Sequence, residues 1–166
     1  MSKTRIIIGL LLIVTLAGAN AWQYWLKPDP LAPAITLNTI NNERISLKGL
    51  QGKPVLVSFW ATSCGLCLAE IDDLITLHNR YQQQGYTTLA VALSYDSLPR
   101  IKQLSQQRKL PYKVIYDEKG EYANAFGGVR MTPTHFLINP DGRIIWQNVG
   151  PVELEALDKL IKPLLG

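Results

Sequence analysis

The chain has two cysteines, Cys64 and Cys67, separated by two residues within Phe59–Glu70 (FWATSCGLCLAE). Two thiols at this spacing can bind a metal ion, form a structural disulfide, or exchange electrons with the disulfide of another protein. A zinc site needs two further ligands, and the two histidines, His78 and His135, stand far apart and are interpreted as ordinary packing or surface residues. A structural disulfide across so short a loop gains little chain entropy. Dithiol exchange is therefore favoured, and metal binding or an inert disulfide are the alternatives.

The residues around the pair predict that the two thiols differ. The apolar, β-branched run Pro54–Trp60 is typical of a strand buried on both faces, and helical spacing begins at Cys64. Free backbone N–H groups and the helix dipole at a helix N-terminus favour a thiolate. Cys67 lies one turn further and is expected to be less exposed. We therefore expect Cys64 to attack a partner's disulfide and Cys67 to resolve the mixed disulfide.

The apolar periodicity of the remaining sequence predicts an α/β domain. Short alternating runs flank Asn41-Asn42, residues that tolerate the positive φ of a tight turn, and predict an N-terminal β-hairpin. Strands that alternate with helices imply a central sheet covered on both faces, and a terminal hairpin makes that sheet mixed. The predicted elements are a hairpin (35–47), a strand (54–60), a helix (64–85), a strand (87–94), a helix capped by Asp96 or Ser97, a strand (112–117), a short helix (119–128), a hairpin (134–149) and a helix after Gly150-Pro151.

The first 26 residues are predicted to be a membrane signal. Lys3 and Arg5 precede an uncharged apolar run, Ile6–Leu26, which as a helix would span about 31 Å and could cross the hydrocarbon core of a bilayer. Basic residues before the run place the N-terminus in the cytoplasm and the rest of the chain outside it. Ala19-Asn20-Ala21 is also a small-residue cleavage site, so a cleaved signal peptide is the alternative to a retained anchor. Both alternatives export the cysteines to a compartment where they can oxidise.

The chain is thus expected to contain a signal-anchor or signal peptide (1–26), a proline-rich linker (27–34) and one domain (35–166). The 17 basic and 13 acidic residues give a net charge of +4, which falls to +2 without Lys3 and Arg5. So weak a field, with no basic cluster interleaved with aromatic residues, does not indicate nucleic-acid binding.

Two separated motifs carry a family resemblance. FWATSCGLCLAE, followed later by GVRMTPTHFLINPDGRII (residues 128–145), resembles the thioredoxin fold and specifically the membrane-tethered TlpA/ResA-like group. That group includes cytochrome c maturation thioredoxins of the CcmG/DsbE kind. The resemblance covers roughly residues 34–166 and implies a thioredoxin-like fold, with a mixed central sheet flanked by helices on both faces.

The resemblance also implies roles for single residues. Cys64 would be the nucleophile and Cys67 the resolving thiol. Pro133 matches the family's cis-proline beside the disulfide, where it would turn the backbone of Thr132 toward a substrate chain held like an added strand. The alternative is a trans proline that opens a strand. Trp60 is included with Thr132 and Pro133 among the expected substrate-binding residues.

Glu70 is the expected proton carrier. It lies three residues after Cys67 and so on nearly the same helix face. Thioredoxin proper has a buried Asp on the strand before the cysteines, where this chain has Ser58, whereas TlpA/ResA-like proteins have a Glu at the position of Glu70. The resemblance implies that Glu70 moves protons to and from Cys67 as the disulfide opens and closes. A solvated helix carboxylate is the alternative.

The chain departs from the group at Ser63, where the group usually has Trp directly before the first cysteine. Without that ring, Cys64 is expected to be more exposed and the docking surface to differ. The Gly65-Leu66 dipeptide between the cysteines is neither the Gly-Pro of thioredoxin nor the Pro-His of strong oxidants. It tunes the reduction potential in a direction that these residues alone do not indicate.

The function implied is that of an exported, membrane-anchored thiol–disulfide oxidoreductase that reduces specific protein disulfides, with cytochrome c maturation as one setting. Electrons would come from a membrane thiol carrier. Because the dithiol itself holds two electrons, no cofactor and no metal is expected. The protein is expected to be a monomer at the inner membrane with its domain in the periplasm, or a cleaved, soluble periplasmic protein.

Two other functions are weighed against this one. A thiol peroxidase of the peroxiredoxin kind shares the fold, but such enzymes have a Pro-x-x-x-Thr approach to the cysteine that is missing before Cys64. A copper chaperone could use the two cysteines with a distant histidine, but copper proteins of related fold space their cysteines by three residues rather than two.

Overall fold

The computed structural model describes residues 28–165, so the predicted membrane segment (1–26) lies outside the described residues. Within this described range, no helix is long and apolar enough to cross a bilayer. The elements are, in order, β1 (Thr36–Asn38), β2 (Arg44–Ser46), η1 (Lys48–Leu50), β3 (Val55–Trp60), α2 (Gly65–Ala69), α3 (Ile71–Tyr81), η2 (Gln82–Gln84), β4 (Thr87–Ala92), α4 (Leu98–Gln107), β5 (Lys113–Tyr116), α5 (Glu121–Ala125), β6 (Thr134–Ile138), β7 (Ile144–Val149), α6 (Leu154–Ile161) and η3 (Lys162–Leu164).

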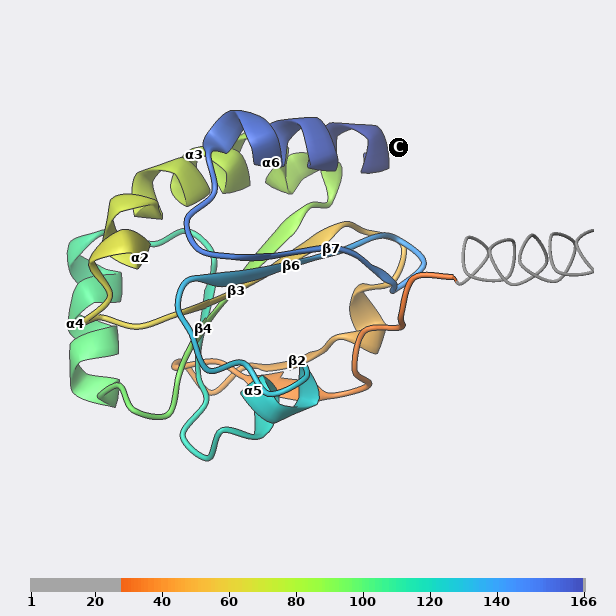
Figure 1. Cartoon of the computed structure of the whole chain (residues 1–166). Coiled ribbons are helices and arrows are strands. Elements are labelled where there is room, and N and C mark those ends of the chain that lie inside the picture. The colour runs from red at the N-terminus through yellow and green to blue at the C-terminus, as the bar shows by residue number, and fades with distance from the viewer. Residues whose placement is uncertain (1–27, 166) are drawn as a thin grey trace, which may run out of the picture.

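A five-stranded mixed sheet forms the centre of the domain (Figure 1). Its order is β5-β4-β3-β6-β7, with β3, β4 and β5 parallel and β6 antiparallel to both β3 and β7. The parallel neighbours are joined through α3 and α4, because parallel strands need a crossover connection. The antiparallel pair β6–β7 needs only a tight turn, in which Gly142 has a φ of 77°. The predicted mixed sheet flanked by helices is confirmed.

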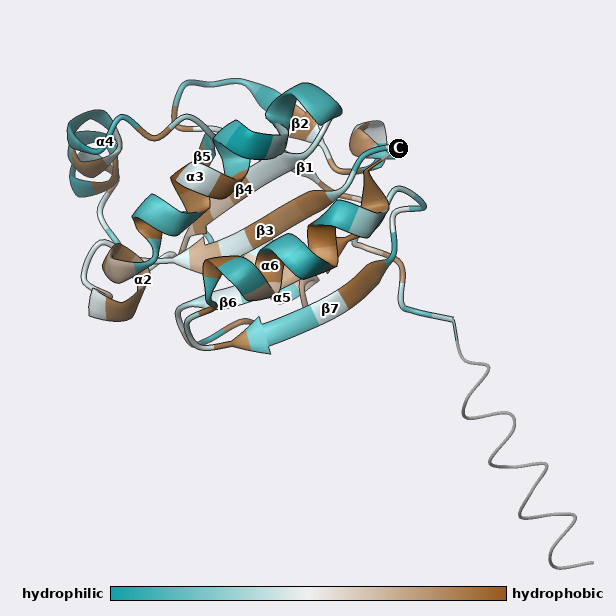
Figure 2. Cartoon of the chain, turned by 90° about the horizontal axis from the view of Figure 1, so that it is seen from above, coloured by the Kyte–Doolittle hydropathy of each residue, from teal (hydrophilic) through white to brown (hydrophobic). Residues whose placement is uncertain are grey.

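The side chains of β3 divide the core into two clusters, one on each face of the sheet. Leu56 and Trp60 belong to the cluster beneath α3 and α6, whereas Val57 and Phe59 belong to the cluster on the other face. All six residues of β3 are buried, which explains its nearly continuous apolar run. Figure 2 shows α3 and α6 side by side over one face of this strand.

A polar contact ties the last helix to α3. The Tyr81 hydroxyl donates to the Asp158 carboxylate at 2.7 Å, and Arg80 forms an ion pair with the same carboxylate. These partners hold the pKa of Asp158 below its usual range. Leu157 and Ile161 on the inner side of α6 are buried, so the helix covers the sheet with its apolar stripe.

The single helix expected at 64–85 is divided in the structure. α2 ends at Ala69, Glu70 has a φ of −89° and a ψ of −3°, and α3 begins at Ile71. Glu70 keeps φ and ψ in the right-handed helical region, so the side-chain spacing of the two helices continues through the break. For this reason, the apolar periodicity of the sequence does not reveal the division.

The residues between 35 and 47 form a two-stranded antiparallel sheet of β1 and β2, with Leu37 opposite Ile45. In the turn between the strands, Asn42 has a φ of 64°. The Ile40 N–H donates to the Val114 carbonyl at 2.9 Å, which attaches this small sheet to β5.

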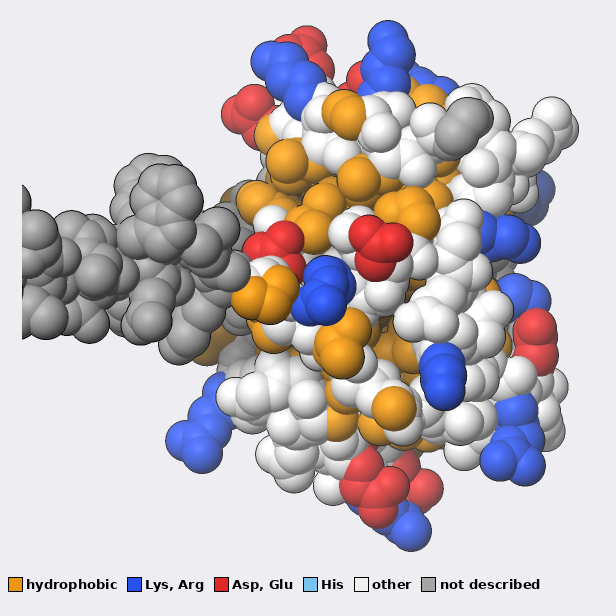
Figure 3. Space-filling model, turned by 90° about the vertical axis from the view of Figure 1, so that its right-hand side faces the viewer, with side chains coloured by type: hydrophobic (Ala, Val, Ile, Leu, Met, Phe, Trp, Pro, Cys, Tyr) orange, Lys and Arg blue, Asp and Glu red, His pale blue; other side chains and the backbone are white. Residues whose placement is uncertain are grey.

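The start of the described chain packs on the β6–β7 turn. The Ala32 N–H donates to the Gly142 carbonyl at 2.9 Å, and the Ile144 N–H donates to the Pro30 carbonyl at 2.8 Å. The Arg143 guanidinium also donates to the Asp29 carbonyl at 2.6 Å. Part of the expected linker is therefore joined to the domain, because this turn supplies partners for its backbone. This end lies opposite α2 (Figure 1), and Figure 3 shows hydrophobic side chains gathered on it.

Candidate active site

Cys64 and Cys67 are joined by a disulfide with a Cα–Cα distance of 5.3 Å. Cys64 is the N-cap residue of α2, and its Sγ accepts a hydrogen bond from the Cys67 N–H at 3.1 Å. Cys67 is 2% exposed, whereas Cys64 is only partly buried. The predicted difference in exposure between the two sulfurs is confirmed.

α2 contains only five residues before the break at Glu70. Because α2 is so short, its dipole stabilises a Cys64 thiolate less than the long helix expected from the sequence would. The Cys67 N–H is a more specific source of stabilisation, because a donor that points at a sulfur favours the negatively charged form of that sulfur. Cleavage of the disulfide would leave this donor beside the Cys64 sulfur.

Asp96 fixes the loop that leads into Cys64. Its carboxylate accepts the Thr62 N–H at 2.6 Å and the Thr62 hydroxyl at 2.7 Å, and also accepts the Ser97 N–H at 2.7 Å. The sequence suggested Asp96 only as a cap for α4, and α4 in fact begins after Ser97 without a side-chain cap. The bond to Thr62 joins residues 34 apart in the sequence, so no local signal reveals it.

The Thr132–Pro133 peptide bond is cis, as the family resemblance implies. Thr134, which begins β6, pairs with Phe59 near the end of β3, so this loop and the cysteine loop leave the same end of the sheet. The Gly150 N–H donates to the Pro133 carbonyl at 2.8 Å, and the Tyr95 and Thr132 hydroxyls are 3.1 Å apart. Thr132 itself precedes the strand, so its backbone is not part of the β-ladder.

Three segments near the disulfide each carry an exposed apolar side chain. Leu66, between the cysteines, is 56% exposed, Tyr95 is 60% exposed and Met131 is 63% exposed. Ser63, where the related group usually has Trp, is also exposed. The chain therefore presents apolar surface near the disulfide even though it has no aromatic ring at position 63.

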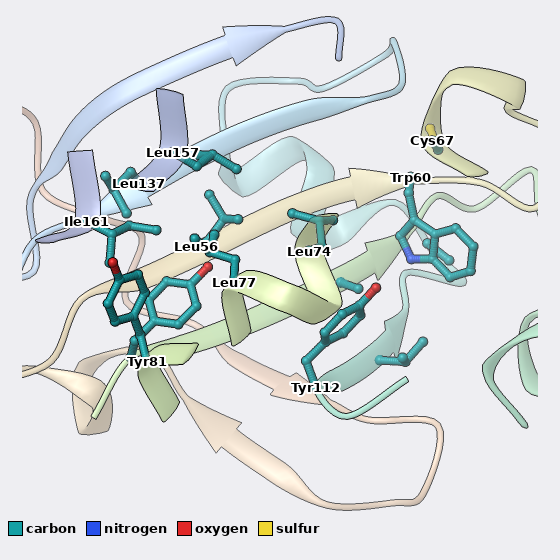
Figure 4. Close-up of a cluster of buried hydrophobic side chains, with 14 of the residues drawn as sticks. Leu56, Trp60, Cys67, Leu74, Leu77, Tyr81, Tyr112, Leu137, Leu157 and Ile161 are labelled. Carbon is teal, nitrogen blue, oxygen red and sulfur yellow. The ribbon is translucent and has the colours of Figure 1, made fainter. Parts of the chain in front are cut away.

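Trp60 does not lie on this surface. It is 4% exposed and belongs to the cluster beneath α3, at the same end as Cys67 (Figure 4). The expected contact between Trp60 and substrate is therefore not supported, because its position in β3 directs it to the core. Trp60 instead lines a cavity of about 10 Å³ behind Cys67. A cavity of this size holds about one water molecule.

Glu70 lines the same cavity and is 5% exposed. The alternative of a solvated helix carboxylate is therefore wrong. Ser58, at the position of thioredoxin's strand Asp, also lines this cavity. Glu70 therefore reaches, from the helices, the same space that a side chain on β3 would reach from the strand. Among the described residues, neither carboxylate oxygen of Glu70 has a hydrogen-bond partner with good geometry.

Two further residues near Glu70 were not expected to take part in a site. His135 is fully buried in β6, and its Nε2 lies 3.3 Å from Oε1 of Glu70. Tyr112 lines the cavity, and burial, together with the charge of Glu70, raises the pKa of its hydroxyl above the usual range. Tyr112 therefore stays protonated at neutral pH. Both residues come from distant parts of the sequence, and only the fold brings them beside Glu70.

No group of three or more His, Cys, Asp or Glu side chains that could hold a metal ion occurs among residues 28–165.

The comparisons with known proteins agree with this geometry. The model of the AhpC/TSA family matches residues 29–147. The sequence is similar to the thiol-disulfide oxidoreductase ResA of Bacillus thuringiensis subsp. konkukian (strain 97-27), with 27% identity over 173 aligned residues that cover 99% of each chain. It is also similar to ResA of Bacillus subtilis (strain 168), with 30% identity over 135 residues that cover 80% of this chain and 74% of that protein.

A solved structure with a similar fold is the thiol:disulfide interchange protein, a thioredoxin family protein, from Chlorobium tepidum TLS. The TM-score is 0.77 with 28% sequence identity, and the match covers 84% of this chain and 99% of that chain.

Replacement of Asp96 by Ala tests how the cysteine loop is held. We expect D96A to lose about 1–3 kcal/mol of stability, because three donors lose a charged acceptor, and to exchange disulfides more slowly. Urea unfolding and the rate of reaction with dithiothreitol measure the two effects. E118A, which removes an exposed carboxylate, is the control. Equal stability of D96A and E118A would show that Asp96 does not hold the loop.

Proposed function

Because the chain belongs to the AhpC/TSA family and is a thiol–disulfide oxidoreductase, we propose that it reduces disulfides of other proteins with Cys64 as the nucleophile. The observation that carries this proposal is the unequal burial of the two sulfurs. Cys64 can meet a partner from solvent, whereas Cys67, at 2% exposure, can react only with Cys64. This division of roles is what a two-step exchange requires.

The reaction transfers two electrons to the partner. In the first step, the Cys64 thiolate attacks the partner's disulfide, an S–S bond forms between Cys64 and the partner, and the partner's second sulfur leaves and takes up a proton. In the second step, Cys67 attacks the Cys64 sulfur. The Cys64–Cys67 bond forms, the mixed disulfide breaks, and the partner leaves as a dithiol. A membrane thiol carrier then reduces Cys64–Cys67 for the next cycle.

Glu70 is the proposed acceptor for the proton that Cys67 loses in the second step. It is buried and lines the same small cavity as Cys67, whereas Asp72, two residues later, is exposed. A general base must lie within hydrogen-bond reach of its proton, directly or through one water molecule, and the cavity has room for about one. The same carboxyl group returns the proton to Cys67 when the donor opens the disulfide.

The proposed substrate is an extended segment of a protein that contains a disulfide. The backbone of Thr132 lies outside the β-ladder at the start of β6, so a substrate strand can add to it. Leu66, Met131 and Tyr95 give the surrounding surface an apolar character, which favours apolar side chains beside the substrate cysteine. Apocytochrome c is one candidate, because the resemblance includes cytochrome c maturation thioredoxins.

The proposed location is the outer side of the inner membrane, with the domain held by residues 1–26. Support comes from the basic and then apolar pattern of these residues in the sequence. The position of residue 28 also supports it, because the described chain begins at the end of the domain opposite α2 (Figure 1). An anchor attached there leaves the disulfide directed away from the bilayer.

The reduction potential tests the direction of electron transfer. We expect a value near or below about −220 mV for the Cys64–Cys67 couple, in the range of glutaredoxins and thioredoxins, because the protein is proposed to donate electrons. Equilibration of the purified protein with defined thiol/disulfide buffers measures it. A value near about −120 mV would instead make the protein a disulfide donor. If the protein consumed peroxide rapidly and did not exchange disulfides, the peroxidase alternative would be favoured.

The variant E70Q tests the proton acceptor. We expect E70Q to slow closure of the Cys64–Cys67 disulfide by about 10²-fold or more and to flatten its dependence on pH, because general base catalysis typically contributes 10²–10⁴-fold. Stopped-flow measurement from pH 5 to 9 provides the profile. D72N, on the exposed side of α3, is the matched control. A pH profile of E70Q that coincides with that of the unmodified protein removes Glu70 from the mechanism.

A fusion of alkaline phosphatase after residue 166 tests export. The reporter is active only when it forms its disulfides outside the cytoplasm. We expect activity with the full chain and none after deletion of residues 1–26. Mass spectrometry of the membrane and soluble fractions then shows whether the N-terminal segment is retained or removed after Ala21. Activity that does not depend on residues 1–26 would contradict the proposed location.

A further inference from the structure

The buried contact between Glu70 and His135 has no place in the mechanism so far. Nε2 of His135 lies 3.3 Å from Oε1 of Glu70, with the two side chains 0% and 5% exposed. Neither ring nitrogen of His135 has a hydrogen-bond partner among the described residues, and the same holds for both oxygens of Glu70. The two residues are thus within ion-pair distance of each other while their polar atoms have no hydrogen-bond partner in the described part of the chain. A buried charge is costly unless a partner of opposite charge compensates it.

Among the residues of the elements packed against His135, Glu70 is the only charged neighbour. Ser58 lies opposite His135 on β3, and Asn148 lies opposite it on β7. The Trp146 ring stacks with the imidazole at a centroid distance of 6.5 Å. Leu157 and Ile161 are the buried residues that α6 contributes to the cluster beneath α3 and α6, while Asp158 is already paired with Arg80 and Tyr81.

The titratable groups on the other side of Glu70 are Cys67 and Tyr112, which line the cavity. Burial keeps the Tyr112 hydroxyl protonated, so it neither supplies nor accepts a proton at neutral pH. Cys67 does not titrate while it is in the disulfide. The only two side chains here that can share a mobile proton in the oxidised protein are therefore Glu70 and His135.

We propose that Glu70 and His135 form one proton-holding pair, which gains the proton that Cys67 loses as the disulfide closes and returns it as the disulfide opens. When Cys67 attacks the Cys64 sulfur, its S–H bond breaks and the electron pair of the mixed disulfide leaves on the partner's sulfur. The proton passes to Glu70 and is held by His135 Nε2 as a carboxylate–imidazolium pair. The inference rests on the proposed role of Glu70, and His135 acts as a positioning residue through it.

The pair explains how a proton can be held inside the core. Burial without a partner disfavours a charged group. A lone buried imidazolium would likewise be unfavourable. With the two in contact, the proton that Cys67 loses is stored as a carboxylate–imidazolium pair, which has no net charge, and it is returned when the disulfide opens.

The histidines of the unmodified protein provide a direct test. We expect the imidazole of His135 to be protonated in a larger fraction of molecules at pH 7 in the oxidised protein than in the reduced protein. We expect no such difference for His78, which contacts Tyr86 and Tyr112 rather than Glu70. Nitrogen-15 NMR of both redox states measures this, and H78Q assigns the signals because the chain has two histidines. An identical protonation of His135 in both states overturns the proposal.

Kinetics of the reduced protein with Ellman's reagent provide a second test. The first release of thionitrobenzoate reports attack by Cys64, and the second reports closure by Cys67. We expect H135Q to slow the second release at least tenfold and to flatten its pH profile, with the first release unchanged. H78Q is the matched control and is expected to stay within twofold of the unmodified protein.

The double variant E70Q/H135Q separates a shared role from two independent ones. Residues that act as a unit are not additive, so we expect the double variant to close its disulfide no more slowly than E70Q alone. If E70Q is slow but H135Q closes normally, the pair is wrong and the proposed role of Glu70 stands. If both variants close normally, both fail. The NMR experiment decides the matter even if H135Q does not fold, because it uses the unmodified histidine.

Discussion

The architecture depends on a geometric constraint: two sulfurs must bond to each other while one meets solvent and the other lies in the core. One helical turn at the end of a buried strand satisfies it. β3 is buried along its whole length, the chain reaches the surface at Ser63, and α2 turns Cys67 back to 2% exposure. Asp96 holds the loop that leads into this turn through its bonds to Thr62.

The interior behind Cys67 differs from the rest of the core. The cluster beneath α3 and α6 is built mostly from aliphatic and aromatic side chains, whose burial stabilises the fold. Ser58, Glu70 and His135 are buried polar residues on this side of the sheet, and Ser58 and Glu70 line a small cavity with Cys67. Burial of a carboxyl group and an imidazole lowers stability unless they compensate each other. Their burial near the redox centre supports the chemical role proposed for them.

Features set by local sequence could be predicted, and features set by pairing between distant segments could not. The spacing of Cys64 and Cys67 at a strand end predicts their unequal exposure, and the family resemblance carried by MTPT implies the cis bond before Pro133. The burial of Trp60 could have been inferred, since it shares a strand face with Leu56. By contrast, the contact of His135 with Glu70 requires both the β3–β6 register and the break between α2 and α3, which helical periodicity does not reveal.

The position of Glu70 and the presence of His135 are connected. The backbone of β3 would fix the position of a carboxylate at residue 58. A carboxylate that reaches this space from the break between α2 and α3 needs another residue to fix its position. The residue opposite Ser58 in the β3–β6 register is His135. The small Ser58 side chain leaves the space into which Glu70 reaches. Because His135 lies two residues after Pro133, the loop proposed to hold substrate and the pair proposed to hold the proton belong to one continuous stretch of chain.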